Sequence, residues 1–524
     1  MSAIREIGSV KQFVLNHGQW LVLALAAVLR FWNLGFPKAL VFDETYYVKD
    51  AWSLSHLGYE SQWPDNANGN FVAGQVDLFT HAASFVVHPQ LGKWLIALGM
   101  NLFGAQNAFS WRIMTALAGV VGVWLVMLVA RRLFKSSGWA QLAGLLFAID
   151  GLTITMSRTA LLDNFLMVFA LLAFYFMLRD QSQVAEELAF RAARADDAKT
   201  SGVIWRRGWL VLCALSLGLA TSIKWSGLYF ALGFGLYIVI SETLTRRRLG
   251  LKHWVSDGLI GQTLANLVLM VPIYVGTYVA GWSSWLLTHG GWDRTWANDP
   301  SNRLPGLLGL LPLPLQSLID YHQQQYGFHV NLHTPHSYMS NPLTWLFVIR
   351  PVSFYYQGNA VGKGGCAGPG DCASAITALG NPLIWWAAAI SVIYLVIRYF
   401  GAIVRVANLR RDNVKAALPQ SHRVQGLTLL GLAGGYLPWL MYMGRTVFQF
   451  YSIAFFAWMI FALVYCLKTL VEESLEERRA IIKRRVKIFV ILCVAMSVWL
   501  SNIWFGYQTP YWYWLLHMWL PSWI

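Results

Sequence analysis

The chain has 524 residues, of which 56% are hydrophobic, 15% are aromatic and only 12% are charged. Soluble domains carry about 25% charged residues, so this composition excludes an ordinary soluble protein and indicates a membrane protein. The formal net charge of +15 would also suit a nucleic-acid-binding protein, and the positions of the basic residues must decide between the two interpretations.

Apolar runs long enough to cross a hydrocarbon core of ~30 Å, which takes roughly 20 helical residues, recur along the whole chain. No small-residue cleavage site follows the first run, so we expect it to remain as the first span. We predict eleven spans, at 18–35, 112–130, 138–156, 160–178, 208–222, 224–241, 258–280, 382–400, 425–443, 447–467 and 486–504. The run at 91–103 is too short to span comfortably and is predicted to lie at the membrane interface.

The positions of the cations test this topology, because cytoplasmic loops carry an excess of Lys and Arg. Of the 40 Lys and Arg residues, 28 fall on the side of the N-terminus. The segments on that side are 1–17, 131–137, 179–207, 242–257, 398–424 and 468–487. We therefore expect a multi-pass protein of the plasma (cell) membrane with a cytoplasmic N-terminus and an outer C-terminus. The net charge then reflects orientation, and no nucleic-acid partner is expected.

Two long segments, 36–111 and 281–381, fall on the outer side, and the second is rich in Trp, Gly, Pro and His. We expect the functional site to lie there. Only Cys366 and Cys372, in "CAGPGDC", could form a disulfide, since the other three cysteines lie in apolar runs where they serve as packing residues.

Isolated ionisable residues gather on the predicted outer face, where the orientation rule disfavours cations and the bilayer disfavours any charge. They are Arg112, Arg158, Lys224 and Arg445, with Asp163 in the turn "SRTALLDNF" and the pair Asp43 and Glu44 just past the first span. A group of cations at headgroup depth suits a lipid phosphate, which Arg binds in bidentate fashion.

Each of these residues also has a structural interpretation. A single Arg at the end of a span is often a snorkelling anchor. Arg158 and Asp163 could pair with each other, and Asp43 and Glu44 could begin an amphipathic helix whose acids favour its N-terminal turn. The convergence of several charges at one depth, in a chain with few charges, favours a site.

Three histidines in "FHVNLHTPHSY" raise the question of a metal site. His329, His333 and His336 have spacings that could bind zinc, but Pro335 interrupts any helix that would align them, and no Cys or carboxylate completes a ligand set. We expect no metal there.

Seven stretches occur in order along the chain: "FDETYYVKDAW", "HPQLGKW", "WRIMTALAG", "SRTALLDNFLM", "SIKWSGLYF", "SNPLTWLFVIRPVSFYY" and "YLPWLMYMGRTVFQFYSIAFFA". With these stretches the chain resembles the protein O-mannosyltransferases, and their actinobacterial members in particular. The resemblance implies one all-α polytopic domain over 1–524 with the C-type glycosyltransferase fold. Eukaryotic members carry a β-trefoil after the seventh span, and segment 281–381 is too short to hold one.

The resemblance implies a polyprenyl phosphate mannose donor and acceptor Ser or Thr hydroxyls of exported polypeptides. Asp43 would be the general base, with inversion at the anomeric carbon. Glu44 would support Asp43 or orient the acceptor, since adjacent helical residues diverge by about 100°. Lipid monophosphate is already a good leaving group, so neither a general acid nor a cofactor is expected.

The remaining site residues follow from the same resemblance. Arg112 would be the main ligand of the donor phosphate, with Lys224 and Arg445 as its partners. The predicted lining residues are His88, Lys93, Arg158 and Asp163. Membrane lipid and the secretion translocon are further candidate partners.

Two other functions remain open. Another C-type transferase could pass the sugar to a glycan or lipid, using the same acid and cations. A transporter would also have many spans and charges, although it should place its polar groups near mid-bilayer on discontinuous helices rather than at the outer face.

Overall fold

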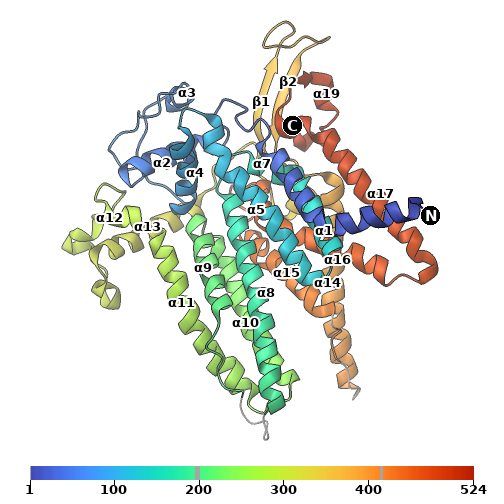
Figure 1. Cartoon of the computed structure of the whole chain (residues 1–524). Helices are drawn as coiled ribbons and strands as arrows, with labels where there is room; N and C mark the ends of the chain where they lie inside the picture. Colours follow the sequence, from blue (N-terminus) through green and yellow to red (C-terminus); the bar gives the residue numbers. More distant parts are fainter. Residues whose placement is uncertain (1, 195–200, 413–416, 420) are drawn as a thin grey trace.

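The computed structural model describes residues 2–194, 201–412, 417–419 and 421–524. Long helices run side by side as one bundle (Figure 1). They are α1 (Ser2–Phe31), α5 (Ala108–Phe134), α6 (Ser137–Ala148), α8 (Asp163–Arg194), α9 (Gly208–Ile223), α10 (Gly227–Arg248), α11 (Thr263–Ala280, after a π-helical turn at Val255–Gln262), α14 (Pro382–Arg411), α15 (Ser421–Gly435), α16 (Ile453–Glu472) and α17 (Glu476–Leu500).

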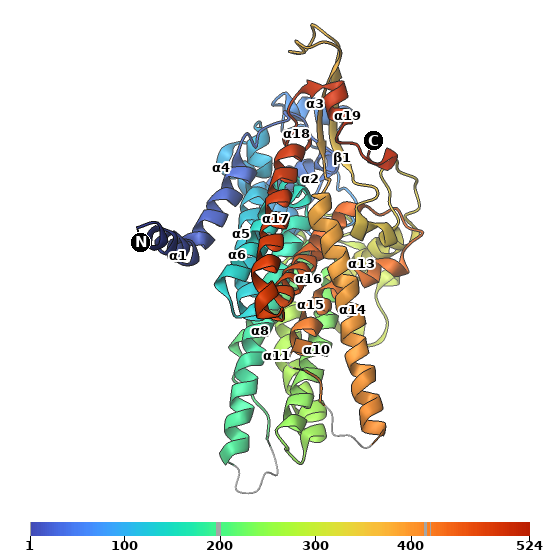
Figure 2. The ribbon, with the colours of Figure 1, turned by 90° about the vertical axis from the view of Figure 1, so that its right-hand side faces the viewer.

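Shorter elements gather mainly at one end of this bundle (Figure 1). They are the helices α2 (Glu44–Leu57), α3 (Ala67–Val72), α4 (Leu91–Phe103), α7 (Gly151–Ser157), α12 (Ser283–Leu287), α13 (Leu313–Asn331), α18 (Asn502–Phe505) and α19 (Tyr511–Leu515), and the strands β1 (Ser353–Asn359), β2 (Cys372–Thr377) and β3 (Thr509–Pro510). We call this the hairpin end, because β1 and β2 protrude from it. The helices α8, α10 and α14 extend far at the opposite end (Figure 2).

Six helices of the described residues are long and apolar enough to cross a membrane, and a bent helix pair brings the number to seven. Each of the eleven predicted spans overlaps a helix, and the chain is a multi-pass membrane protein. The helices α1, α9, α15 and α17 do not meet the length and composition test, so the count of eleven stays a prediction.

The bent pair is α6 and α7, whose axes differ by 65°. Asp150 lies at the break and caps α7, accepting hydrogen bonds from the backbone N–H groups of Leu152 and Thr153 at 3.0 and 3.4 Å. An N-cap of this kind supplies a partner for the otherwise unpaired first donors of a helix. The predicted span 138–156 is therefore broken near its C-terminal end.

The core is built around α16, whose residues from Ile453 to Tyr465 are all buried. Close approach of α15 makes this possible: a Cβ on Gly431 would lie 2.0 Å from the indole of Trp458. Only glycine fits there, so α15 can lie directly against the large aromatic side chains of α16.

A small antiparallel sheet, ordered β1-β2-β3, was not predicted. In β1 and β2, Ser353 lies opposite Thr377 and Asn359 lies opposite Cys372. Cys366 and Cys372 form the disulfide that the sequence allowed, closing the loop before β2.

The structure also revises the boundaries of the predicted loops. The short helix predicted at 91–103 is α4 (Leu91–Phe103). The predicted connector 179–207 is instead helical as far as Arg194, because α8 continues out of the apolar region. Residues 195–200 of that connector, and 413–416 and 420 of the connector 398–424, lie outside the described residues.

Candidate active site

The predicted site residues all lie at the hairpin end, where helices begin or end. Asp43 directly precedes α2, Asp163 begins α8, and Lys224 lies between α9 and α10. His88 precedes α4, and Arg445 lies in the connection between α15 and α16. Helix ends place polar side chains beside unpaired backbone groups, outside the apolar length of each helix.

The adjacent residues Asp43 and Glu44 lie in different environments. Glu44 is completely buried and accepts hydrogen bonds from Arg112, Nε to Oε1 at 2.7 Å and Nη2 to Oε2 at 2.8 Å. The backbone N–H groups of Val41 and Ala160 donate to the same carboxylate, at 3.0 and 2.8 Å. Glu44 is therefore fully engaged within the protein.

Arg112, near the start of α5, is also completely buried. Besides Glu44, it donates from Nη1 to the carbonyl of Pro37 at 3.0 Å and from Nη2 to the carbonyl of Ala39 at 2.9 Å. This arrangement differs from the prediction that Arg112 binds the donor phosphate. Every nitrogen of the Arg112 guanidinium has an acceptor inside the protein. The guanidinium forms a bidentate ion pair with Glu44 instead of binding a phosphate.

Asp43, by contrast, is partly exposed. Burial raises the pKa of its carboxyl to about 6, although the Lys224 ammonium and a hydrogen bond from the Tyr47 hydroxyl lower it. The like charge of Asp163 acts in the same direction as burial. A carboxyl with this pKa can accept and release a proton near neutral pH.

Lys224 and Asp163 form a close ion pair beside Asp43. The ammonium Nζ donates to Oδ2 of Asp163 at 2.7 Å and lies 4.9 Å from the ring centroid of Tyr451. The alternative pairing of Asp163 with Arg158 is therefore wrong: Lys224, from a different connection, reaches the carboxylate.

Arg445 is held by a histidine of α13. Its Nη2 donates to Nδ1 of His329 at 2.9 Å, while Nε2 of His329 lies 2.8 Å from the carbonyl of Val87. Burial lowers the pKa of His329 to about 4, so the ring is neutral, with its proton on Nε2. The Nε of Arg445 is buried and has no hydrogen-bond partner among the described residues, so it can serve an anionic ligand.

His88 stacks on His329 with ring centroids 5.3 Å apart. Burial holds the pKa of His88 well below its ordinary value, and the charges of Lys224, Lys93 and Arg445 act in the same direction. The imidazole is therefore neutral in a region of positive potential.

Two other predicted lining residues have contacts within the protein. Arg158 donates to the carbonyls of Trp32 at 2.5 Å and Asn33 at 3.1 Å, just past the end of α1. Lys93 is buried in an ion pair with Glu60 and donates to the carbonyl of His88 at 3.3 Å. Arg158 anchors the chain before Asp43, and Lys93 holds the backbone at His88.

Four predicted residues line one pocket of about 200 Å³: His88, Asp163, Lys224 and Arg445. The other lining residues are Trp225, Ser226, Leu228, Tyr229, Tyr326, His329, Val330, Pro438, Trp439, Tyr442 and Tyr451. The pocket is thus aromatic on much of its wall, with two cations and one carboxylate.

The three histidines considered for zinc have separate partners. Nδ1 of His333 lies 2.9 Å from the carbonyl of Gly444, and the ring of His336 packs edge-on against Phe42 at 5.7 Å. His329 holds Arg445, as described above. The described residues contain no group of three or more His, Cys, Asp or Glu arranged for a metal ion.

Sequence reasoning did not assign Tyr47, His329 or Tyr451 to this site, although His329 was considered as a zinc ligand. Tyr47 could have been found, because it follows Asp43 by four residues in a predicted helix, and residues at this spacing lie on the same face of a helix. His329 and Tyr451 come from segments far away in the sequence, and no local pattern links them to Asp43.

Comparison with a solved structure defines the class of protein. A chain of the S. cerevisiae protein O-mannosyltransferase Pmt1-Pmt2 complex, bound to the sugar donor, matches 97% of this chain and 93% of its own length, with a TM-score of 0.70 at 17% identity. The chain thus has the fold of a C-type membrane glycosyltransferase, as the sequence predicted.

Sequence comparison narrows the class to a family. The model of dolichyl-phosphate-mannose-protein mannosyltransferases matches residues 20–288, and that of the C-terminal four-span region of protein O-mannosyltransferases matches residues 314–523. This chain belongs to the protein O-mannosyltransferase family.

Bacterial relatives match over nearly the whole chain. The polyprenol-phosphate-mannose–protein mannosyltransferase of Mycolicibacterium smegmatis is 31% identical over 96% of this chain and 92% of its own. The Corynebacterium glutamicum protein of the same name is 28% identical over 96% of this chain and 93% of its own.

Proposed function

We propose that this chain transfers mannose from a polyprenyl phosphate mannose to Ser or Thr hydroxyls of exported polypeptides. The names of the bacterial relatives and the donor-bound yeast complex support this donor and this acceptor class. The observation that carries the proposal is Asp43, with a pKa raised to about 6, beside a pocket lined by Lys224 and Arg445.

Arg445 and Lys224, rather than Arg112, bind the phosphate in this proposal. The free Nε of Arg445 is directed to no protein acceptor, whereas Arg112 has no free donor. Lys224 adds a second positive charge in the same pocket. As the sugar leaves, negative charge grows on the phosphate, and these cations stabilise the transition state more than the ground state.

Asp43 acts as the general base. The acceptor oxygen forms a bond to the anomeric carbon, the bond from that carbon to the phosphate oxygen breaks, and Asp43 takes the hydroxyl proton. Attack from the face opposite the phosphate inverts the anomeric carbon. Glu44 and Arg112 do not touch substrate; they fix the start of α2 so that Asp43 points at the acceptor.

The site lies on the outer side of the cell membrane in this proposal, with the N-terminus in the cytoplasm. The excess of basic residues at the opposite helix ends supports this orientation. Acceptors would then arrive as unfolded exported chains, and the secretion translocon is the candidate supplier.

A transfer assay with purified protein tests the function. Radiolabelled polyprenyl phosphate mannose is offered with a Thr peptide, the same peptide with Val in place of Thr, or an oligosaccharide. We expect label only on the Thr peptide. Transfer to the oligosaccharide alone would establish a glycan-directed transferase, and no transfer to any acceptor would overturn the proposal.

A further inference from the structure

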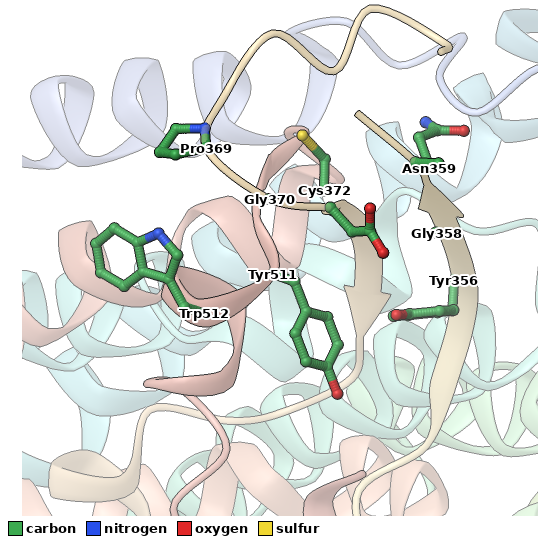
Figure 3. A pocket seen from close by; sticks show the side chains of 10 residues that line it. Tyr356, Gly358, Asn359, Pro369, Gly370, Cys372, Tyr511 and Trp512 are labelled. Carbon is green, nitrogen blue, oxygen red and sulfur yellow. The ribbon is translucent and has the colours of Figure 1, made fainter. Parts of the chain in front are cut away.

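A second pocket lies between the β1–β2 hairpin and α19 (Figure 3), and it shares no lining residue with the pocket described above. Its volume is about 550 Å³. The lining residues are Tyr356, Gly358, Asn359 and Ala360 from β1 and its end, Pro369, Gly370, Asp371 and Cys372 at the start of β2, and Tyr511 and Trp512 from α19. The disulfide of Cys372 fixes the loop that forms one wall.

Three aromatic side chains of this pocket are presented to solvent. Tyr356, Tyr511 and Trp512 are 49%, 43% and 57% exposed. Buried Trp514 packs against both tyrosines, with ring centroids 5.4 Å from each. The tyrosine rings are therefore held in place from behind while they remain free to contact a ligand.

Asp371 is the only charged residue among those that line the pocket. It is exposed, and within the part of the chain that the structure describes its carboxylate accepts one long hydrogen bond, from the backbone N–H of Val361 at 3.4 Å. Aromatic faces and a carboxylate without a paired cation attract a positive group, through cation–π contacts and charge. The same lining repels the phosphate of a lipid-linked sugar, so the pocket differs in chemistry from the one beside Asp43.

The hairpin connects this pocket to Asp43. Phe354, in β1, contacts the ring of Phe42 with centroids 5.4 Å apart, and Phe42 directly precedes Asp43. From Phe354 to Gly358 the strand rises by roughly 13 Å, at about 3.3 Å per residue. An extended polypeptide with its hydroxyl at Asp43 would reach the pocket with a residue about four to six positions away.

We propose that this pocket binds a Lys or Arg side chain of the acceptor polypeptide, a few residues from the hydroxyl that receives the sugar. The proposal rests on the proposed function for its choice of occupant. It makes acceptor selection depend on a positive residue near the modified Ser or Thr.

Binding of peptides to the intact protein tests this directly. The protein carries Asp43→Asn so that no transfer occurs, and the probes are fluorescent Thr peptides with either Lys or norleucine five residues from the Thr, on each side in turn. We expect the Lys peptide to bind more tightly than the norleucine peptide when the substituted residue lies on one particular side of the Thr. Asp371→Asn and Trp512→Leu should each weaken binding of the Lys peptide by about tenfold and leave binding of the norleucine peptide unchanged.

The matched control is Asp65→Asn, which removes an exposed carboxylate in the other long segment, 36–111, and should change nothing. In the active protein, Asp371→Asn should raise KM for the Lys peptide and leave kcat unaltered. Equal binding of the Lys and norleucine peptides would overturn the proposal, as would tight binding of a mannosylated peptide regardless of its charge.

Failure of the proposed function gives a different result. If Lys-dependent binding requires Asp371 but the active protein transfers no mannose, the pocket is a cation site and the mannosyltransferase proposal fails. If transfer occurs and Asp371→Asn affects both peptides alike, the function stands and the pocket proposal fails.

Discussion

Asp43 and Glu44 are adjacent, yet Glu44 accepts four hydrogen bonds in the protein interior, whereas Asp43 is partly exposed and interacts with the Lys224 ammonium. Neighbouring residues at the start of a helix diverge by about 100°, so the two carboxylates cannot share one role. At the residue scale, the chemistry therefore depends on Asp43 alone, with Glu44 as a positioning residue.

The pH dependence of transfer reports the ionisation of Asp43. A general base works only when deprotonated, and its pKa is raised to about 6, so kcat/KM should fall as the pH drops through about 6. Tyr47→Phe removes a hydrogen bond that lowers this pKa, so the falling limb should move to higher pH. A profile that is flat between pH 5 and 8 in both proteins would contradict the base assignment.

Arg445→Gln tests the phosphate contact. Loss of a charged donor should reduce kcat/KM for the lipid donor by about 10- to 100-fold and leave KM for the peptide unaltered. Arg350→Gln is the control, because this guanidinium donates to the carbonyls of Ser337 and Ser522 and does not line the pocket. Unchanged kinetics with the lipid donor in Arg445→Gln would contradict the assignment of Arg445 as a phosphate ligand.

At this scale the sequence predicted Lys224, Arg445, Asp163 and His88 as members of one site, and they line one pocket. Isolated charges in an apolar chain are costly, which is why they stand out. Arg112 stood out for the same reason. Its buried partner lies 68 positions away, and no local pattern reveals which acceptor a buried arginine finds.

At the scale of elements, the ion pair between Glu44 and Arg112 clamps the start of α2 to α5. The same guanidinium binds carbonyls of the segment between α1 and α2, so a single side chain ties three elements together. This clamp fixes the backbone on which Asp43 sits.

Arg112→Gln should therefore destabilise the protein rather than weaken donor binding. Removing one partner of a buried pair leaves an uncompensated charge, which costs about 3–5 kcal/mol. We expect a lower thermal unfolding midpoint in detergent, with Arg445→Gln unfolding like the wild type. Wild-type thermal stability for Arg112→Gln together with a raised KM for the lipid donor would restore its phosphate role.

The elements differ in how well the sequence predicted them. The amphipathic run of α4 has the same bounds in the structure as in the sequence, because its length and flanking residues are local features. The strands β1 and β2 were missed. Their segments are short, β2 consists largely of small residues, and the pairing depends on the Cys366–Cys372 disulfide and on β3, which lies over 130 residues further along the chain.

At the scale of the whole molecule, charge separates along the bundle. The helices α5, α10 and α14 carry arginines in their last turns, away from the hairpin end, and α10 and α14 extend far at the opposite end of the bundle (Figure 2). Cations near a cytoplasmic surface orient a membrane protein during insertion. The polarity of the bundle thus supports an outward-facing site.

Labelling of introduced cysteines tests this orientation. Asp65 and Lys252 are both exposed and lie at opposite ends of the molecule. An impermeant thiol reagent applied to intact cells should label Asp65→Cys directly and Lys252→Cys only after the membrane is opened. The reverse pattern would place the site on the cytoplasmic side.

The fold class could be predicted from the sequence, because the apolar composition and the length of the apolar runs match a lipid bilayer along the whole chain. The count of eleven spans stays a prediction. The helices α15 and α17 depend on packing and on charged ends, and the break in α6–α7 depends on the side chain of Asp150. Such features are decided by tertiary contacts.

The most direct test of the assigned roles is to measure donor binding and transfer on one preparation of Asp43→Asn. We expect lipid-donor binding as in the wild type and a loss of transfer to the Thr peptide of about 10²- to 10⁴-fold, since only the proton acceptor is removed. Transfer at the wild-type rate would contradict the assignment of Asp43 as the base.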